Sequence, residues 1–427
     1  MNKYDIILEI LKDSVKPALG CTEPGAVAFA VSRSKEILGE DILKLTLSVD
    51  KNILKNGMFV TIPGTNEKGL LFAAALAIAC GRPEYGLEAL KEVSSNDIQK
   101  AREIIKGNVV DLILKKDAEG LFIKAQAQGR FHNSTVIIMG KHDNIVFESK
   151  DETVIKSHLQ NSKSLNISEL KNFSISELVD FANSIDIEKI EFLYDGIQMN
   201  RKIAQSGLNE NVGIGFGKFV MSKASDAESL AIALTVSASE ARMSGYALPV
   251  TSSAGSGNHG LLAIIPISII GEKEGFDRDE ILRALALSHL LTAYVKAYTG
   301  VLSSLCGCGI AAGVGCSAGL TYLREKSITK IENSIKNVLA GLSGMICDGA
   351  KIGCAYKLYL SSISAIEASN MALNGIVVPS DNGILAESAK KCIENLGRLS
   401  NQAMKDADDK FWTLCSKNFI NLTNCKF

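Results

Sequence analysis

The chain has few aromatic residues and no excess of charge of either sign. Aromatic residues make up 6% of it, and only one of them is Trp. The 46 Lys and Arg and the 47 Asp and Glu leave a formal net charge of -1. Binding to nucleic acid or to an anionic membrane surface needs a basic patch or tail, which this balance does not provide. We therefore expect no nucleic-acid partner and no membrane partner.

Long hydrophobic runs are also missing. The longest, Gly260–Gly271, includes Pro266 and is much shorter than the roughly 20 residues that cross a bilayer. The first residues, Met1–Lys12, carry Asp5 and Glu9, which the apolar core of a signal peptide lacks. We therefore expect a cytoplasmic protein. The sequence leaves its oligomeric state, homo-oligomers included, open.

The hydrophobic pattern predicts two parts that join near residue 245. Residues 1–245 predict an α+β domain with a meander sheet, and residues 246–427 predict an all-helical domain. Apolar residues at helical spacing predict helices over 2–13, 24–38, 70–79, 175–184, 187–203 and 224–243. Alternating or β-branched residues predict strands over 45–49, 58–62, 109–115, 120–129, 134–139 and 143–148, the last four forming the antiparallel meander. Thr22 is expected to cap the second helix.

Two cysteine clusters in the last third of the chain are its most informative feature. They are Cys306-Gly307-Cys308 and the segment Cys347–Cys354. Cys347 and Cys354 are seven residues apart, so on a helix both thiols would leave nearly the same face. A third thiol from the first cluster would complete a set of three thiolates, which can hold an iron–sulfur cubane with one iron open to a substrate.

Other interpretations of the cysteines are weaker. Without a secretion signal, structural disulfides are not expected. A structural zinc site commonly uses two tight pairs of ligands, and the spacings here do not form that pattern. Five cysteines are expected to serve only as small buried apolar residues. They are Cys80, Cys316, Cys392, Cys415 and Cys425.

Cys21 directly precedes the predicted helix 24–38. The partial positive charge of a helix N-terminus stabilises a thiolate, so we expect the pKa of Cys21 to be low. Such a thiolate can act as a nucleophile, a base or a metal ligand. The alternative, a buried structural cysteine in a turn, is equally compatible with this motif alone.

The loop Thr251–Gly260 is rich in Gly and Ser and precedes an apolar helix. Its backbone N–H groups and hydroxyls, with Ser256 among them, can bind a carboxylate, and Asn258 and His259 add side chains for the same purpose. The alternative is a flexible connector with a capping serine. His289, among apolar residues of a helix, is expected to be a hydrogen-bonded core histidine.

Two further segments are expected to have no role in a site. The glycines of 211–217 superficially resemble a phosphate loop, but no strand clearly precedes them and the full pattern is not met. The pair Asn200-Arg201 can bind a carboxylate, although a solvated surface pair is the simpler interpretation.

Four motifs together resemble those of the L-cysteine desulfidase family, which is related to the α chain of the iron–sulfur L-serine dehydratases. They are Gly20-Cys21-Thr22-Glu23-Pro24 and the segments Ser253–Gly260, Cys306–Gly313 and Gly344–Lys351. The resemblance runs from about residue 10 to about residue 410. Each motif alone is weak, whereas the four in this order are specific.

The resemblance implies a lyase that converts L-cysteine by α,β-elimination to sulfide, ammonia and pyruvate without pyridoxal phosphate. It implies a [4Fe–4S] cluster in domain 246–427, held by Cys308, Cys347 and Cys354, with Cys306 as the alternate for Cys308. Domain 1–245 would supply Cys21, which matches the family's catalytic cysteine and would take the α proton of a small amino-acid substrate.

Three other functions remain open from the sequence. One is a dehydratase for L-serine or another β-substituted amino acid, which only the pocket side chains would distinguish. A non-catalytic iron–sulfur sensor needs a partner-binding module such as a basic helix-turn-helix, and we find none in the sequence. A zinc-stabilised structural protein is the weakest of the three.

Overall fold

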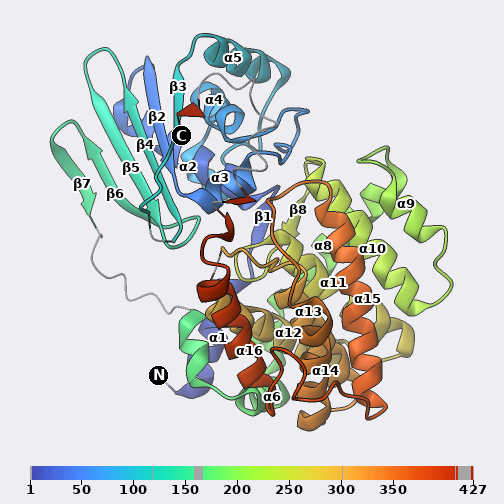
Figure 1. Ribbon diagram of the computed structural model, residues 1–427. Coiled ribbons are helices and arrows are strands. Elements are labelled where there is room, and N and C mark those ends of the chain that lie inside the picture. Colours follow the sequence, from blue (N-terminus) through green and yellow to red (C-terminus); the bar gives the residue numbers. More distant parts are fainter. Residues whose placement is uncertain are drawn as a thin grey trace.

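A computed structural model of the chain describes residues 2–118, 120–157, 167–300, 302–408, 410–411 and 425–426. Figure 1 shows two parts of the molecule side by side. The smaller part is a twisted sheet with helices on one of its faces, and the larger part is made of packed helices. The mixed α+β architecture predicted from the sequence is confirmed, as is the helical character of the C-terminal part.

The smaller part contains a mixed sheet with the strand order β7-β6-β5-β4-β2-β3-β9 among the described residues. Its strands are β2 (Lys44–Val49), β3 (Val110–Leu114), β4 (Phe122–Gln128), β5 (Asn133–Met139), β6 (Ile145–Lys150), β7 (Thr153–Ser157) and β9 (Cys425–Lys426). Strands β4 to β7 pair antiparallel in succession and form the meander.

The prediction that 109–115 opens this meander was wrong. Strand β3 lies parallel to β2, and β2 separates it from β4. Parallel neighbours need a long crossover, which here contains the helices α3 (Lys51–Gly57), α4 (Leu70–Cys80) and α5 (Ser95–Lys106) and the 3₁₀ segment η1 (Pro83–Glu88). Helix α5 was not predicted. Helix α2 (Thr22–Leu38) packs against α4 and against strands β4 and β5.

The predicted strand at 58–62 was also wrong. Within this segment only Thr61 forms a bridge, with Lys68. Val60 and Ile62 are fully buried, but they pack against the interior of the molecule rather than pairing in the sheet. A short run of β-branched residues indicates that the segment is buried. Burial alone does not distinguish a strand from an extended core segment.

The larger part is built from helices around one hydrophobic cluster. They are α1 (Lys3–Ser14), α6 (Ile175–Ser184), α7 (Ile187–Ile190), α8 (Phe192–Asn209), α9 (Phe216–Met221), α10 (Ala227–Met243), α11 (Gly257–Glu274), α12 (Arg278–Thr299), α13 (Ile310–Arg324), α14 (Ile328–Leu342), α15 (Cys354–Leu373) and α16 (Ala389–Arg398), with η2 (Ile167–Asn172) and η3 (Leu399–Ala403). The cluster takes in α1 and the helices from α6 onward. The predicted division into domains at residue 245 stays a prediction.

A two-stranded sheet joins the N-terminal segment to the loop before α11. Strands β1 (Pro17–Leu19) and β8 (Pro249–Thr251) pair antiparallel, and Ser252 donates its N–H to the carbonyl of Lys16. Asn200 is fully buried, accepts from the N–H of Thr251 and donates to the carbonyl of Gly260. Asn200 is therefore not the solvated surface residue that we expected, because it holds this loop in place.

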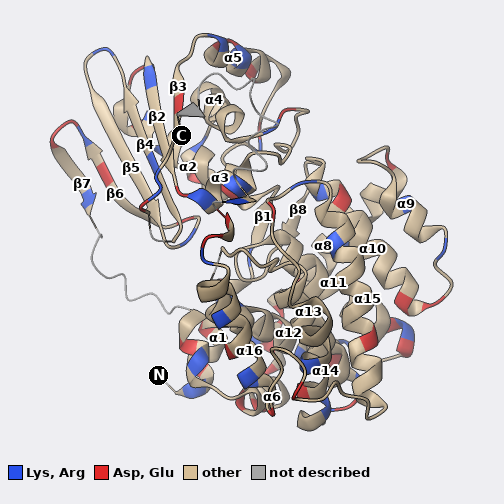
Figure 2. Ribbon diagram, viewed as in Figure 1, with Lys and Arg blue, Asp and Glu red and all other residues tan. Residues whose placement is uncertain are grey.

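Figure 2 shows Lys and Arg together with Asp and Glu in both parts of the molecule, although single elements such as α3 carry charges of one sign only. Within the described residues, no helix combines the length and hydrophobicity needed to cross a bilayer.

Candidate functional site

A buried cavity lies where the two parts of the molecule meet. Four stretches of sequence supply the predicted site residues among its walls, and other elements complete the lining. The lining includes Cys21, Glu23, Asn56, Arg242, Ser256, Asn258, His259, Lys296, Cys306, Cys308, Cys347, Cys354 and Lys357. The fold therefore brings every predicted site residue to one cavity.

The first wall is the start of helix α2. Cys21 is its N-cap residue, although its side chain makes no capping hydrogen bond, and the expected cap Thr22 lies inside the helix. The thiol of Cys21 donates to the Oε2 atom of Glu23 at 2.7 Å, and Asn56 donates to Oε1 of the same carboxylate at 2.9 Å. Glu23 and Cys21 are both buried.

The electrostatics of Cys21 differ from the sequence expectation. Burial raises the pKa of the Cys21 thiol, the negative charge of Glu23 raises it further, and the positive charge of Arg242 opposes them; the pKa ends well above its usual value. Burial also raises the pKa of Glu23, but His142 and hydrogen bonds from Cys21 and Asn56 outweigh it and lower that pKa overall. The low thiol pKa predicted from the helix N-terminus was therefore wrong, because the sulfur is buried and a carboxylate lies beside it.

The two cysteine clusters lie side by side. Leu305 and Ile346 form an antiparallel bridge, Cys306 donates its N–H to Met345, and Cys347 donates its N–H to Ser304. This short pairing brings the Cys306–Cys308 loop against the loop that contains Cys347. Burial raises the pKa of Cys347 and of Cys354, and a thiolate at Cys306 would raise both further.

Cys347 and Cys354 do not share a helix, contrary to the prediction. Helix α15 begins at Cys354, and Cys347 lies in the loop before it. Gly349 explains the break, since its φ of +95° is unfavourable for other residues, and a Cβ there would lie 2.4 Å from the carbonyl oxygen of Lys55. Both thiols nevertheless line the same cavity.

The remaining cysteines behave largely as expected. Cys316 and Cys392 are buried, and Cys80 is partly buried. Cys415 and the side chain of Cys425 lie outside the described residues. All eight cysteines of the described part are free thiols.

The loop before α11 forms another wall. His259 is buried, and its Nδ1 lies 2.9 Å from the carbonyl oxygen of Ser253. A carbonyl only accepts, so Nδ1 carries the proton and Nε2 is an acceptor. Burial, with the nearby charge of Lys296, lowers the pKa of His259 to about 3, so the ring is neutral. A Cβ at Gly307 would lie 2.6 Å from Nε2, so glycine is required for this approach.

Ser256 and Asn258 complete this loop. The hydroxyl of Ser256 lies 3.6 Å from the sulfur of Cys308, which links the loop to the first cysteine cluster. The side-chain oxygen of Asn258 accepts from Ser239 at 3.4 Å. His289 was predicted to be a hydrogen-bonded core histidine. Its Nδ1 has such a partner, because it lies 2.8 Å from the hydroxyl of Ser253.

Lysines surround the cysteine walls. Burial lowers the pKa of Lys296 to about 8, although Cys347, Cys308 and Cys306 oppose that shift. Lys357 donates to the carbonyl oxygen of Ile346 and also pairs with Asp348. Three thiols therefore lie within reach of two ammonium groups, which would offset the negative charge of thiolates.

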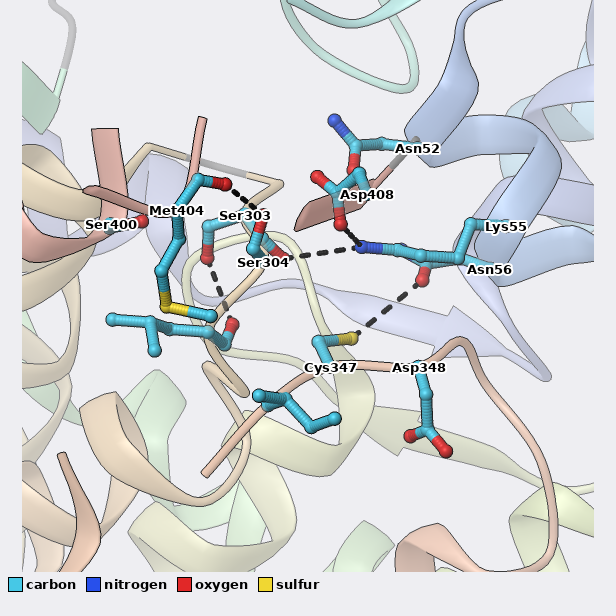
Figure 3. Close-up of polar contacts among 12 residues, drawn as sticks. Asn52, Lys55, Asn56, Ser303, Ser304, Cys347, Asp348, Ser400, Met404 and Asp408 are labelled. Carbon is cyan, nitrogen blue, oxygen red and sulfur yellow. Dashed lines mark hydrogen bonds and ion pairs between the residues drawn. The ribbon is translucent and has the colours of Figure 1, made fainter. Parts of the chain in front are cut away.

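Figure 3 shows how helix α3 holds the loop of Cys347 from the other side. Lys55 is buried and pairs with Asp408 at 2.6 Å, and it also donates to the carbonyl of Ser303 at 3.4 Å. The thiol of Cys347 lies 3.8 Å from the side-chain oxygen of Asn56. Asn56 thus contacts both Glu23 and Cys347.

Four helices begin at this cavity without a side-chain cap. Their N-cap residues are Cys21, Ser256, Gly309 and Gly353, and none of these side chains accepts a capping hydrogen bond. Helices elsewhere vary: α5, α6 and α12 have a complete capping box, whereas α4, α7, α8 and α9 also lack a side-chain cap. A helix N-terminus without a side-chain cap has N–H groups available to another acceptor and a partial positive charge. These helix starts therefore favour the binding of an anion in the cavity.

Sequence analysis missed several residues of this site. Glu23 belongs to the same short motif as Cys21, and an acidic residue two positions after a candidate base was a signal that could have found it. Asn56, Lys296 and Lys357 come from three separate helices, and no sequence motif indicates that they meet. The rejection of 211–217 as a nucleotide site agrees with the structure, because N–H groups of Ile214, Phe216 and Gly217 bind the carboxylate of Glu240.

Comparison with known proteins places the chain in a family. The family model described as serine dehydratase alpha chain matches residues 84–411. A UPF0597 protein of Caldanaerobacter subterraneus subsp. tengcongensis is 59% identical over 407 residues, which are 95% of this chain and 96% of the relative. A UPF0597 protein of Clostridium tetani is 52% identical over 412 residues, 96% of this chain and 97% of the relative.

A third relative, a UPF0597 protein of Clostridioides difficile, is 41% identical over 414 residues, covering 94% of this chain and 97% of its own length. The matched residues include both cysteine clusters and the loop before α11, and the relatives match nearly the whole chain. The resemblance stated from the four motifs is therefore confirmed, and the chain belongs to the serine dehydratase alpha chain family.

Proposed function

We propose that this protein is an iron–sulfur lyase that converts L-cysteine to sulfide, ammonia and pyruvate. The observation that carries the proposal is the single buried cavity that contains Cys21, His259 and both cysteine clusters. Family membership supports a lyase, and the four motifs favour L-cysteine as the substrate. An L-serine dehydratase is the alternative of the same class, and a non-catalytic iron–sulfur sensor is the alternative of another class.

The residues of the cavity fit a [4Fe–4S] cluster. Within the described residues, no three His, Cys, Asp or Glu side chains converge closely enough for a single metal ion. A cubane binds each thiolate at a different iron, so its ligands lie farther apart than those of one ion. Four thiols, four uncapped helix starts and the nearby lysines provide ligands and compensating charge for such an anionic group.

We propose Cys308, Cys347 and Cys354 as the ligands. Cys306 is the alternate for Cys308, since both belong to the same short loop and both line the cavity. When bound by three thiolates, the cluster supplies an open iron that acts as a Lewis acid toward the substrate. No pyridoxal phosphate takes part in the proposed reaction.

Cys21 is the proposed base. Its thiol proton is directed at Glu23, so this carboxylate is the acceptor through which the thiolate would form. The transfer is uphill, because the pKa of Cys21 is raised and that of Glu23 is lowered, so the thiolate is a minor form. Glu23 would later pass its proton to the leaving sulfide. The thiolate then takes the α proton of L-cysteine. The electron pair left on Cα forms the Cα–Cβ double bond as the Cβ–S bond breaks and sulfide leaves. Water then converts the resulting enamine to pyruvate and ammonia.

Ser256, Asn258 and His259 are the proposed substrate-binding residues. They stand at the start of α11, and Ser256 also lies beside Cys308. The unprotonated Nε2 of His259 can accept a hydrogen bond from the ammonium group of an amino acid. Free N–H groups of the helix start suit the carboxylate of the same molecule.

The experiment that tests the proposal is an anaerobic assay of the reconstituted protein for sulfide and pyruvate from L-cysteine, with L-serine in parallel. We expect equal amounts of sulfide and pyruvate from L-cysteine and slower release of pyruvate from L-serine. Faster turnover of L-serine would favour the dehydratase. An intact cluster with no turnover of either amino acid would favour the sensor.

A further inference from the structure

Arg242, on helix α10, is a buried cation without an acidic partner among the described residues. Its side chain is 2% exposed, and its Nη2 atom donates to the carbonyl oxygen of Gly20 at 2.6 Å. Its Nε atom has no hydrogen-bond partner. An unpaired buried guanidinium is costly, so a fold that keeps one either has a use for it or would be more stable without it.

The guanidinium of Arg242 lies against the first residue of helix α11. A Cβ at Gly257 would lie 2.5 Å from Nε and 2.8 Å from Cζ, so only glycine permits this approach. The N-cap residue Ser256 makes no side-chain capping bond, and the helix runs for 18 residues. A full charge and the partial charge of a helix start therefore coincide at one corner of the cavity.

The neighbouring groups determine which kind of ligand can bind at this corner of the cavity. Asn258 lines the cavity, and its side-chain oxygen accepts from Ser239, so its amide nitrogen is the donor it can offer a ligand. His259 offers only an acceptor, as described above. The other buried cation, Lys296, lies beside Gly307 and Ser303 and faces the thiols. The corner at Arg242 thus presents donors in a planar fork, which matches a carboxylate.

We propose that Arg242 binds the α-carboxylate of the amino-acid substrate, together with the N–H groups at the start of α11. The inference rests on the proposed function and adds a specificity-determining residue to it. Arg242 is also close to Cys21, on whose thiol its charge acts. A carboxylate held at Arg242 places the adjoining Cα next to the proposed base. The site therefore requires a free carboxylate and discriminates against esters and amides of the same amino acid.

The first test compares L-cysteine with L-cysteinamide as substrates of the anaerobically reconstituted holoenzyme. Wild-type protein is expected to prefer the free acid. Arg242→Gln should lower kcat/KM for L-cysteine about 10- to 100-fold, the range of a lost charge-assisted hydrogen bond, and leave that for the amide almost unchanged. Arg242→Lys should restore part of the preference. The visible absorbance of the cluster should be the same in all three proteins.

Arg324→Gln is the matched control, since Arg324 is a largely buried arginine of helix α13 that pairs with Glu228 and Glu274 outside the cavity. It should keep the preference for the free acid. If Arg242→Gln lowers turnover of both substrates by the same factor, Arg242 supports the structure only, and the proposal is wrong.

A second measurement does not depend on turnover. Calorimetric titration with L-alanine and L-alaninamide, which carry no leaving group, reports binding alone. Wild-type protein should bind L-alanine more tightly, and Arg242→Gln should abolish that difference. A wild-type protein that shows this difference but releases no sulfide would disprove the proposed function and keep the Arg242 site. Equal binding of the two by wild-type protein would overturn the site.

Discussion

The thiol of Cys21 lies 2.7 Å from a carboxylate oxygen of Glu23, with both side chains buried beside the cavity. Because the carboxylate is the acceptor for the thiol proton, Glu23→Gln should lower kcat for L-cysteine by about 10²- to 10⁴-fold, the usual contribution of a positioned acid or base. Cluster absorbance should not change. Glu67→Gln, at a carboxylate that pairs with Arg102 outside the cavity, should leave kcat unchanged. Full activity of Glu23→Gln would remove this carboxylate from the mechanism.

Cys21 itself is predicted to be essential for turnover and dispensable for the cluster. Cys21→Ser should keep the visible spectrum and lose most activity, because a hydroxyl is a far poorer base near neutral pH. Exchange of the α proton of L-alanine with deuterated solvent, followed by NMR, should stop in the same variant. Loss of the cluster in Cys21→Ser would instead make this residue a ligand.

Replacement of the proposed ligands should abolish the cluster. Cys347→Ala, Cys354→Ala and Cys308→Ala are each expected to lose the broad visible absorbance of the anaerobically reconstituted protein, together with its iron and acid-labile sulfide. Cys316→Ala is the control, because this thiol is buried in α13 and does not line the cavity. If Cys308→Ala keeps a full cluster and Cys306→Ala loses it, the two cysteines exchange roles.

His259→Ala should weaken binding of the substrate while cluster absorbance persists. Loss of one hydrogen bond to the ammonium group is expected to raise KM for L-cysteine roughly tenfold. Steady-state kinetics measured under anaerobic conditions provide the check. If the kinetics of His259→Ala equal those of the wild type, the loop before α11 is a connector and does not bind the substrate.

Two buried histidines predict how stability depends on pH. Burial lowers the pKa of His289 to about 3, and His259 behaves alike. Between about pH 6.5 and pH 3 the unfolded chain binds protons at these positions that the folded protein does not bind, so stability falls as the pH falls. Each histidine should contribute a slope of about 1.4 kcal/mol per pH unit.

His289→Gln isolates one of these contributions, because glutamine does not titrate. Urea unfolding at pH 7, 6 and 5 should show a shallower loss of stability in His289→Gln than in the wild type, by about 1.4 kcal/mol per pH unit in the acidic range. Parallel curves for the two proteins would show that His289 is not protonated on unfolding.

The sequence was most informative where the pattern is local. Helix α6 begins and ends as predicted, since Ser174 and Glu177 form a capping box before an apolar stripe. The predicted strands 120–129, 134–139 and 143–148 match β4, β5 and β6 of the meander, whereas β7 was not predicted. Such features depend on neighbours in the sequence, and propensity and periodicity describe them well.

Features that depend on distant contacts could not be predicted. The position of β3 beside β2, and the burial of 58–62 without a strand partner, are decided by packing across the molecule. The family motifs identified the cysteines, but not the burial and the neighbouring carboxylate that raise the pKa of Cys21. That shift requires the depth of the cavity and the position of Glu23, which spacing alone does not give.

The four helix N-termini without a side-chain cap make the stability of the fold depend on whether an anionic group is bound at the site. A helix without a side-chain cap is less stable by a few tenths to about 1 kcal/mol, so these helix starts leave room for stabilisation by a bound anion. An anionic group that binds only the folded state would supply that stabilisation. The melting temperature of this protein should therefore report how much of a preparation carries the proposed cluster, and loss of the cluster to oxygen should lower it.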